Sequence, residues 1–442
     1  MVNSDMNVTH FLKKYNMNSD QIDIDDCCNV FLKEMEQGLA GHDSTLAMIP
    51  TYMETEKNVP TGKPVVVMDA GGTNFRVATV YFNTDNNKDV IENFHMYKMP
   101  GVEKEVGREE FFNIMAEYVS GIAHKSSNIG FCFSYPTEIF PDKDGKLIRF
   151  SKEIKAKEVE GRMIGENLNA ALAKAGHKNP KHVVILNDTV TTLLAGRAAS
   201  FSKSYSSYIG FILGTGTNCA YIESNSKIKK RPDLNPAKSQ IINIESGGFG
   251  KAPMGIIDKK FDASTTNPGE YTFEKMISGA YLGPLILMTL QQASEDGFFS
   301  KITCQRLKDI AQLSTIDINN FLCDPKSTGN PLSALLLNHP DEHANADLEK
   351  MFDLVKKMVA RSAKLTAINL SSVVLKSGKG KDPEHPVCIT AEGTTFFRFN
   401  GFQSNVESYL EEYLVKQKKR YYEIRSVENA TLIGAAIAGL TN

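Results

Sequence analysis

Two glycine-rich turns constrain the fold of this chain more than any other feature of its sequence. The tripeptide Gly-Thr-Asn occurs at residues 72–74 and again at 216–218, and each copy stands between two apolar runs. An apolar run, a tight glycine-rich turn and a second apolar run are typical of a β-hairpin. The distance between the copies is far longer than a solenoid repeat, so we expect a duplicated unit with one hairpin loop in each half. Two such loops facing each other would hold a polyphosphate between two lobes. A chance similarity of short Gly-Thr segments is the alternative.

Length and composition exclude several classes of protein. A chain of 442 residues is long enough for two or three domains. The balance of 50 basic and 52 acidic residues gives no reason to expect nucleic acid or a membrane as partner. No apolar run of about 20 residues and no secretion signal occur, so we expect neither a membrane span nor export. Seven scattered cysteines without a C-x-x-C pair indicate reduced thiols and a cytoplasmic location.

Strand and helix patterns alternate along the chain. Short apolar runs at 129–133, 183–186 and 387–390 predict buried strands, and Val373 with Val374 predicts the start of another. Helical spacing of apolar residues predicts helices at 25–48, 160–175, 281–292, 348–369 and 429–440. This alternation predicts an α/β fold.

The first turn, Asp69-Ala-Gly-Gly-Thr-Asn-Phe-Arg76, has the composition of a phosphate-binding loop. Glycines allow the backbone to approach a phosphate closely, and Arg76 can offset its charge. Asp69 only accepts hydrogen bonds when ionised, so it suits a hydrated cation. Gly, Asn and Asp are also the commonest residues of ordinary turns, which leaves a plain hairpin as the alternative.

Asn187 and Asp188 directly follow the apolar run 183–186. The carboxyl end of a strand is where α/β folds place their ligand crevices. A carboxylate there can accept a proton from a hydroxyl that attacks a γ-phosphate. Taken alone, the pattern fits better an Asp that caps a helix beginning near Thr189, which is a common arrangement.

Two further carboxylates suit a polyol substrate. Glu245 follows the apolar run 241–244, and Glu274 lies in the segment 267–275. Each carboxylate accepts hydrogen bonds from two hydroxyls, which favours a sugar. A solvated helix residue is the alternative for Glu274. A glycosidase would also use two carboxylates, but it would not need the Gly-Thr loops.

In their order along the chain, these motifs resemble those of the hexokinase family. The similarity runs from about residue 63 to the C-terminus, through segments at 69–77, 130–136, 150–152, 187–189, 214–218, 244–250, 267–275 and 391–394. The resemblance implies two ribonuclease-H-like lobes, the actin-like ATPase fold, with a central cleft. It assigns residues 62–187 plus 425–442 to a small lobe and 1–61 plus 188–424 to a large lobe.

The resemblance also implies an activity and a role for each matched residue. It implies transfer of the ATP γ-phosphoryl group to the 6-hydroxyl of an aldohexose, glucose before mannose or fructose, as the first step of glycolysis. Asp188 would take the hydroxyl proton, Lys152 would hold charge near the phosphoryl group, and Mg²⁺ would lie near Asp69 through water. The sugar would be hydrogen-bonded by Ser134, Ser151, Lys152, Asn187, Asp188, Asn218, Glu245 and Glu274. Phosphates and nucleotide would contact Gly71, Gly72, Thr73, Asn74 and Arg76 on one side and Thr215, Gly216, Gly393 and Thr394 on the other.

Some positions depart from the family pattern. Ser151, Glu153 and Ile154 stand where the family has Thr, Gly and Phe, and Tyr271 stands where Gln is usual. Glu392 and Thr394 replace Asp and Ser. These changes leave the reaction intact and concern the preference for one sugar over another.

A catalytically weak, hexokinase-like glucose sensor is the alternative function, and an ATPase of the actin or Hsp70 kind is a further one. The sequence does not fix the oligomeric state.

Overall fold

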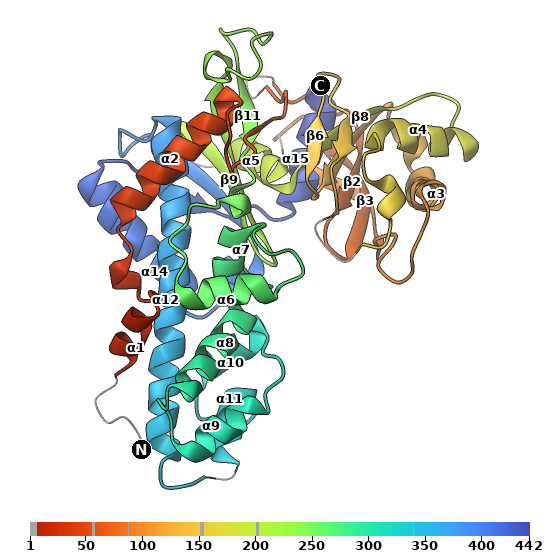
Figure 1. The fold of residues 1–442 in the computed structure, drawn as a ribbon. Helices are drawn as coiled ribbons and strands as arrows, with labels where there is room; N and C mark the ends of the chain where they lie inside the picture. The colour runs from red at the N-terminus through yellow and green to blue at the C-terminus, as the bar shows by residue number, and fades with distance from the viewer. Residues whose placement is uncertain (1–6, 55–57, 87, 151–153, 200–202, 339) are drawn as a thin grey trace.

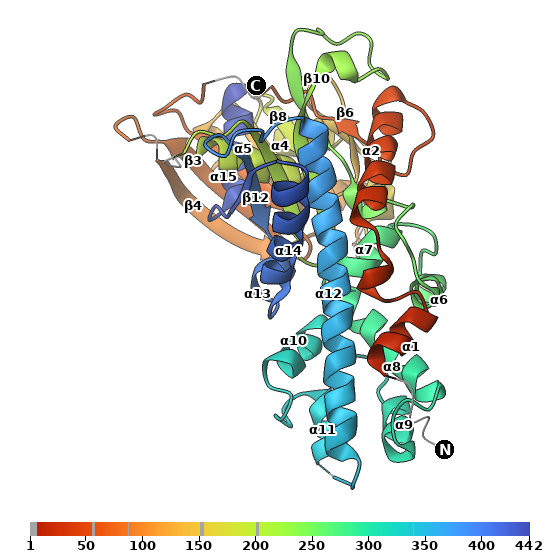
Figure 2. The same ribbon diagram turned by 90° about the vertical axis from the view of Figure 1, so that its left-hand side faces the viewer.

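The computed structural model describes residues 7–54, 58–86, 88–150, 154–199, 203–338 and 340–442. Two β-sheets form separate bodies, and a layer of helices lies between them (Figure 1). One body is compact, whereas the other extends along a long helix, α12 (Ala344–Ser377), as both ribbon views show (Figures 1 and 2).

The two sheets share one connectivity. The smaller sheet has the order β4-β3-β2-β5-β8, and the larger has the order β11-β10-β9-β12-β13 with β1 added at its edge. In both, three antiparallel strands are followed by two parallel ones. This repeated order confirms the duplicated unit predicted from the two turns. The strands are β1 (Ile49–Pro50), β2 (Val65–Ala70), β3 (Asn74–Phe82), β4 (Asp89–Lys98), β5 (Asn128–Phe133), β8 (His182–Leu186), β9 (Ser207–Leu213), β10 (Thr217–Ser224), β11 (Ser239–Asn243), β12 (Val387–Glu392) and β13 (Tyr422–Arg425).

Both glycine-rich turns are β-hairpins. In the first, Asp69 pairs with Arg76 across β2 and β3, and the Gly71 amide donates to the Asn74 carbonyl oxygen at 3.2 Å. In the second, Leu213 pairs with Thr217 across β9 and β10. Both loops therefore project from corresponding ends of the two sheets.

Two helices form the layer between the sheets, namely α5 (Asp188–Ala198) and α15 (Ala430–Thr441). A Cβ atom on Gly210 of β9 would lie 1.9 Å from the Thr189 carbonyl oxygen, and one on Gly130 of β5 would lie 1.8 Å from that of Ala435. Only glycine permits approaches this close, so α5 rests directly on the larger sheet and α15 on the smaller. The first turn of α5 is thereby fixed against β9.

Helix α12 corrects one prediction. Val373 and Val374 do not begin a strand, because both are fully buried residues of α12, which continues to Ser377 and ends at Gly378 in a left-handed conformation. The apolar helical spacing of this segment extends past Asn369, and it outweighs the local β-preference of two valines.

The remaining helices cover the outer faces of the sheets and build the extended body. Helices α3 and α4 pack on each other beside the smaller sheet, and α2 packs on α12. Within the described ranges, no helix combines the length and apolarity needed to cross a membrane. The helices are α1 (Val8–Lys14), α2 (Ile24–Ala40), α3 (Arg108–Ser120), α4 (Ile164–Lys174), α6 (Ile256–Ser264), α7 (Thr272–Ile277), α8 (Leu282–Glu295), α9 (Lys301–Lys308), α10 (Thr315–Cys323), α11 (Pro331–Leu337), α13 (Thr394–Arg398) and α14 (Phe402–Leu410); a two-stranded sheet adds β6 (Thr137–Ile139) and β7 (Gly145–Leu147).

Candidate active site

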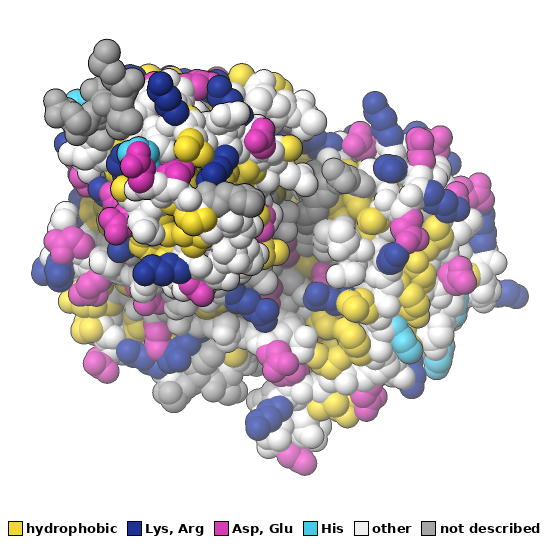
Figure 3. All heavy atoms as spheres, turned by 90° about the horizontal axis from the view of Figure 1, so that it is seen from below, with side chains coloured by type: hydrophobic (Ala, Val, Ile, Leu, Met, Phe, Trp, Pro, Cys, Tyr) yellow, Lys and Arg dark blue, Asp and Glu magenta, His cyan; other side chains and the backbone are white. Residues whose placement is uncertain are grey.

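A pocket of about 720 Å³ opens between the two bodies, and both glycine-rich loops line it. Seen from below, the molecule is hollowed where the two bodies meet (Figure 3). Of the sequence-predicted residues, the structure places Asp69, Gly71, Gly72, Thr73, Asn74, Arg76, Ser134, Asp188, Thr215 and Gly393 on the pocket wall. Ser151 and Lys152 lie outside the described residues.

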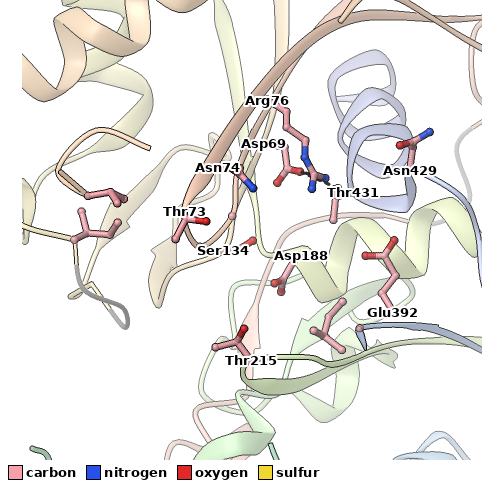
Figure 4. Close-up of a pocket in the computed structure, with 16 residues that line it drawn as sticks. Asp69, Thr73, Asn74, Arg76, Ser134, Asp188, Thr215, Glu392, Asn429 and Thr431 are labelled. Carbon is pink, nitrogen blue, oxygen red and sulfur yellow. Dashed lines mark hydrogen bonds and ion pairs between the residues drawn. The ribbon is translucent and has the colours of Figure 1, made fainter. Parts of the chain in front are cut away.

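Asp69 and Arg76 face each other on neighbouring strands at one wall of the pocket (Figure 4). The Asp69 carboxylate accepts from Arg76 Nη1 at 3.3 Å and from the Thr431 hydroxyl of α15 at 3.0 Å. Burial raises the pKa of Asp69 above its usual value, Arg76 opposes that shift, and the nearby Asp188 adds to it. A cation or a phosphate-bound metal ion at this wall would relieve the repulsion between the two carboxylates.

Asp188 is the first residue of α5 and stands among the labelled side chains of the pocket (Figure 4). Asn187 is the N-cap, because its Oδ1 accepts from the Thr189 amide at 3.0 Å and from the Thr189 hydroxyl at 2.6 Å. The residue that caps this helix is therefore Asn187, whereas the alternative interpretation gave that role to Asp188. Asp188 Oδ1 accepts from the same amide at 2.9 Å, so its carboxylate is held at the helix N-terminus with an edge toward the pocket.

A chain of amide and carboxylate groups lies next to Asp188. Asn218 Nδ2 donates to Asn187 Oδ1 at 3.2 Å and to Asn243 Oδ1 at 2.7 Å. Asn243 Nδ2 in turn donates to Glu245 Oε1 at 2.9 Å. Glu245 adopts a left-handed backbone, with φ of 57°, which is uncommon for a residue with a side chain and is typical of functional positions. Burial raises the pKa of Glu245, and its hydrogen bond from Asn243 opposes that shift.

Glu274 is tied to the second glycine-rich loop. Its Oε2 accepts from the Thr217 amide at 2.8 Å. A Cβ on Gly216 would lie 2.5 Å from the same oxygen, so a larger residue here would push the Glu274 carboxylate away from the loop. Glu274 is therefore held against the second glycine-rich loop and is not a solvated helix residue.

The loop after β12 completes the pocket. Gly393 has φ of 119°, and its Cα lies against Gly214 of the second hairpin turn. Thr394 begins α13 directly behind it. Glu392 lines the pocket, and burial together with Asp188 and Asp69 raises its pKa to about 7.

Sequence reasoning missed several residues of the site. Asn429 and Thr431 line the pocket from the start of α15, and Asn243 holds Glu245. Arg149 was missed as well, although its Nη1 donates to Glu270 Oε2 at 2.6 Å and its guanidinium stacks 5.3 Å from the Tyr271 ring centre. Asn243 is the last residue of β11, and a polar residue at the end of an apolar run could have marked it in the sequence. No local pattern marks Arg149, because its partners lie about 120 positions away in the sequence.

The Tyr271 ring closes one side of the carboxylate network. Its hydroxyl donates to Glu245 Oε2 at 3.2 Å, and its backbone is left-handed with φ of 49°. Burial beside Glu245 raises the pKa of Tyr271, so the phenol stays protonated and donates. Arg149, Tyr271 and Glu245 therefore form one contact chain that starts beside β7 and ends at β11.

Two ribonuclease-H-like sheets that share a glycine-lined pocket define the actin-like ATPase class of fold. A family model described as Hexokinase matches residues 208–441, and a second with the same description matches residues 7–198. The chain therefore belongs to the hexokinase family, which is a family of phosphotransferases. The resemblance found in the sequence is confirmed.

Relatives and solved structures agree with this assignment. The chain is 28% identical to Hexokinase-5 of Oryza sativa subsp. japonica over 438 residues, which is 92% of this chain and 84% of that protein. It is 29% identical to Hexokinase-1 of Arabidopsis thaliana over 434 residues, with coverages of 91% and 85%. A structure of the hexokinase from Schistosoma mansoni complexed with glucose superposes with a TM-score of 0.78 at 24% identity, covering 98% of this chain and 100% of that one. That structure supports the two-lobed fold.

Proposed function

We propose that the protein transfers the γ-phosphoryl group of ATP to the 6-hydroxyl of an aldohexose, with glucose preferred over mannose or fructose. The observation that carries this proposal is the position of Asp188. Its carboxylate lies between loops suited to phosphate and a buried network suited to a polyol. In such a site the carboxylate accepts the proton of the attacking hydroxyl, while positioning and electrostatics supply most of the acceleration.

The phosphate side is assigned to the two hairpin loops. Gly71 and Gly72 bring backbone without side chains to the pocket wall, and Thr73 and Asn74 add polar side chains. Arg76 offsets the negative charge of the phosphates from the same wall. Thr215, Gly216, Gly393 and Thr394 hold the nucleotide from the opposite loop.

The sugar side is assigned to the amide and carboxylate network. Asn187, Asn218, Glu245 and Glu274 present acceptors and donors that can pair with several hydroxyls at once. Ser134 adds a hydroxyl at the pocket wall. Ser151 and Lys152 keep the roles that the family resemblance gives them, contact with the sugar and, for Lys152, with the transferring phosphoryl group.

Magnesium fits the wall next to Asp69. Two carboxylates, Asp69 and Asp188, repel each other across the pocket, and carboxylate oxygen is the ligand type that Mg²⁺ prefers. Asp69 would hold the ion through water, and the bound ion would neutralise charge on the nucleotide phosphates.

The lobe boundaries and the cellular setting belong to the same proposal. We divide the chain into a small lobe, 62–187 plus 425–442, and a large lobe, 1–61 plus 188–424, that close over the sugar and exclude water. The reaction would be the first step of glycolysis. All seven cysteines are free thiols in the structure, which supports a cytoplasmic location.

A coupled assay with a panel of hexoses, followed by identification of the product, tests this function. We expect ATP-dependent formation of hexose 6-phosphate from glucose. Glucose binding without turnover would instead favour the sensor, and ATP hydrolysis without sugar phosphorylation would favour an ATPase.

A further inference from the structure

A second cavity lies at the far end of the elements that build the active site. It measures about 360 Å³, half the volume of the active-site pocket. The last turn of α5 contributes to it, together with the beginnings of β9 and β11 and the ends of β10 and α12. Arg197 lies nine residues along α5 from Asp188, about 14 Å at the rise of an α-helix, so the two cavities do not overlap.

Cations and hydroxyls dominate the wall of this second cavity. Arg197, Lys227 and Lys379 supply three positive charges from three different segments. The side chains of Ser207, Tyr208 and Ser239 add hydroxyl groups between them. Guanidinium, ammonium and hydroxyl donors around one concave space are the groups that proteins use to bind phosphate.

Glu223 supplies the only carboxylate among the described residues of this wall, and the protein already satisfies it. Its Oε2 accepts from the Tyr221 hydroxyl at 2.8 Å, and its Oε1 accepts from the Ser224 amide at 2.9 Å. Lys227 Nζ approaches Oε1 at 3.4 Å. Among the described lining residues, three cations and one carboxylate give a formal excess of two positive charges.

The backbone that carries Lys379 is fixed before any ligand binds. The Ser206 hydroxyl accepts from the Gly380 amide at 3.0 Å and donates to the Pro386 carbonyl oxygen at 3.2 Å. The Ser377 hydroxyl accepts from the Lys379 amide at 3.2 Å. A wall that is held in place in this way lowers the entropic cost of binding.

We propose that this cavity is a second binding site, distinct from the active site, for a small phosphate-bearing anion. The arrangement favours a ligand with two or more negative charges, such as a phosphomonoester or a polyphosphate, because such a ligand neutralises the excess on the wall. The concave shape and the modest volume favour a small molecule over a nucleic acid strand.

Equilibrium dialysis of the full chain against labelled pyrophosphate tests the site. The test variant is the double substitution Lys227→Gln with Lys379→Gln, at two exposed positions remote from the active-site pocket. The matched control is Lys301→Gln with Lys308→Gln, which removes the same charge from exposed positions on α9. A third variant, Arg76→Gln, weakens pyrophosphate binding in the active-site pocket alone.

The test variant is expected to bind one pyrophosphate fewer per chain than the wild type while keeping its kinase activity. The α9 control and the Arg76 variant are expected to keep the second site. A competing arm with a phosphomonoester, glycerol phosphate, shows which of the two ligand types displaces the label. Equal stoichiometry in the wild type and the test variant would overturn the proposal, as would an equal loss of binding in the α9 control.

Discussion

Replacing Arg149 by alanine removes a contact that joins the two lobes. Arg149 follows β7, whose Leu147 belongs to the core of the smaller sheet. Its partners, Glu270 and Tyr271, precede α7, whose Phe273 belongs to the core of the larger body. The contact therefore links the two bodies, and in the proposed mechanism it would favour their closed arrangement over the sugar.

The magnitude follows from the two interactions that are lost. The pair between Arg149 and Glu270 is partly exposed, at 38% and 46%, so we assign it about 0.5 kcal/mol after solvent screening. The stacking of the guanidinium on Tyr271 adds about 0.5–1 kcal/mol. A total of about 1–1.5 kcal/mol corresponds to roughly a 5- to 12-fold change in the closure equilibrium.

Steady-state kinetics with glucose as the varied substrate measures this effect. Arg149→Ala is expected to raise KM for glucose by that factor, with a smaller effect on kcat, because Asp188 and the phosphate loops are untouched. Arg149→Lys serves as the matched control, since it keeps the ion pair and loses the planar stacking, and it should show an intermediate KM. A KM for Arg149→Ala within twofold of the wild type would refute the bridging role.

Three further changes test other parts of the structure. Gly216→Ala is expected to raise KM for glucose by tenfold or more, because the new Cβ displaces Glu274 from the Thr217 amide; an unchanged KM would contradict the contact. Arg361→Leu is expected to lower the free energy of unfolding by about 3–5 kcal/mol in urea titrations, because it strands the fully buried Asp258 carboxylate; a loss below about 1 kcal/mol would contradict this. Since the folded-state pKa of Glu392, about 7, lies above its usual 4.5, the folded chain retains a proton that the unfolded chain has released. The free energy of unfolding should thus fall by about 1–3 kcal/mol more in the wild type than in Glu392→Gln between pH 4.5 and 7.5, and parallel curves would exclude the shift.

Local sequence patterns predicted the parts of the fold that depend on local rules. Both glycine-rich hairpins follow from turn chemistry, and the end of β8 at Leu186 follows from an apolar run that stops before the polar Asn187. The wrong strand at Val373 shows the limit of this approach, because helical packing over the whole of α12 outweighs the preference of two β-branched residues.

The site was predicted where motifs carry it and missed where distant segments meet. The roles of Asp188 and Glu245 were inferred from ordered motifs along the chain. The bond from Tyr271 to Glu245 joins two segments of the large lobe that lie apart in the sequence, and the stacking of Arg149 on Tyr271 joins the two lobes. No short-range pattern encodes either contact. The left-handed backbone of Glu245 was likewise invisible in the sequence, since such conformations are rare for residues with side chains.

The proton-accepting role of Asp188 is tested most directly by measuring turnover and glucose affinity on the same variant, Asp188→Asn. The amide preserves the size of the side chain and its place at the start of α5, but it cannot accept the hydroxyl proton. We expect kcat to fall by about 10²–10⁴-fold, while glucose binding measured by calorimetry weakens by less than about tenfold. Near-normal turnover in this variant would contradict the assignment of Asp188 as the base.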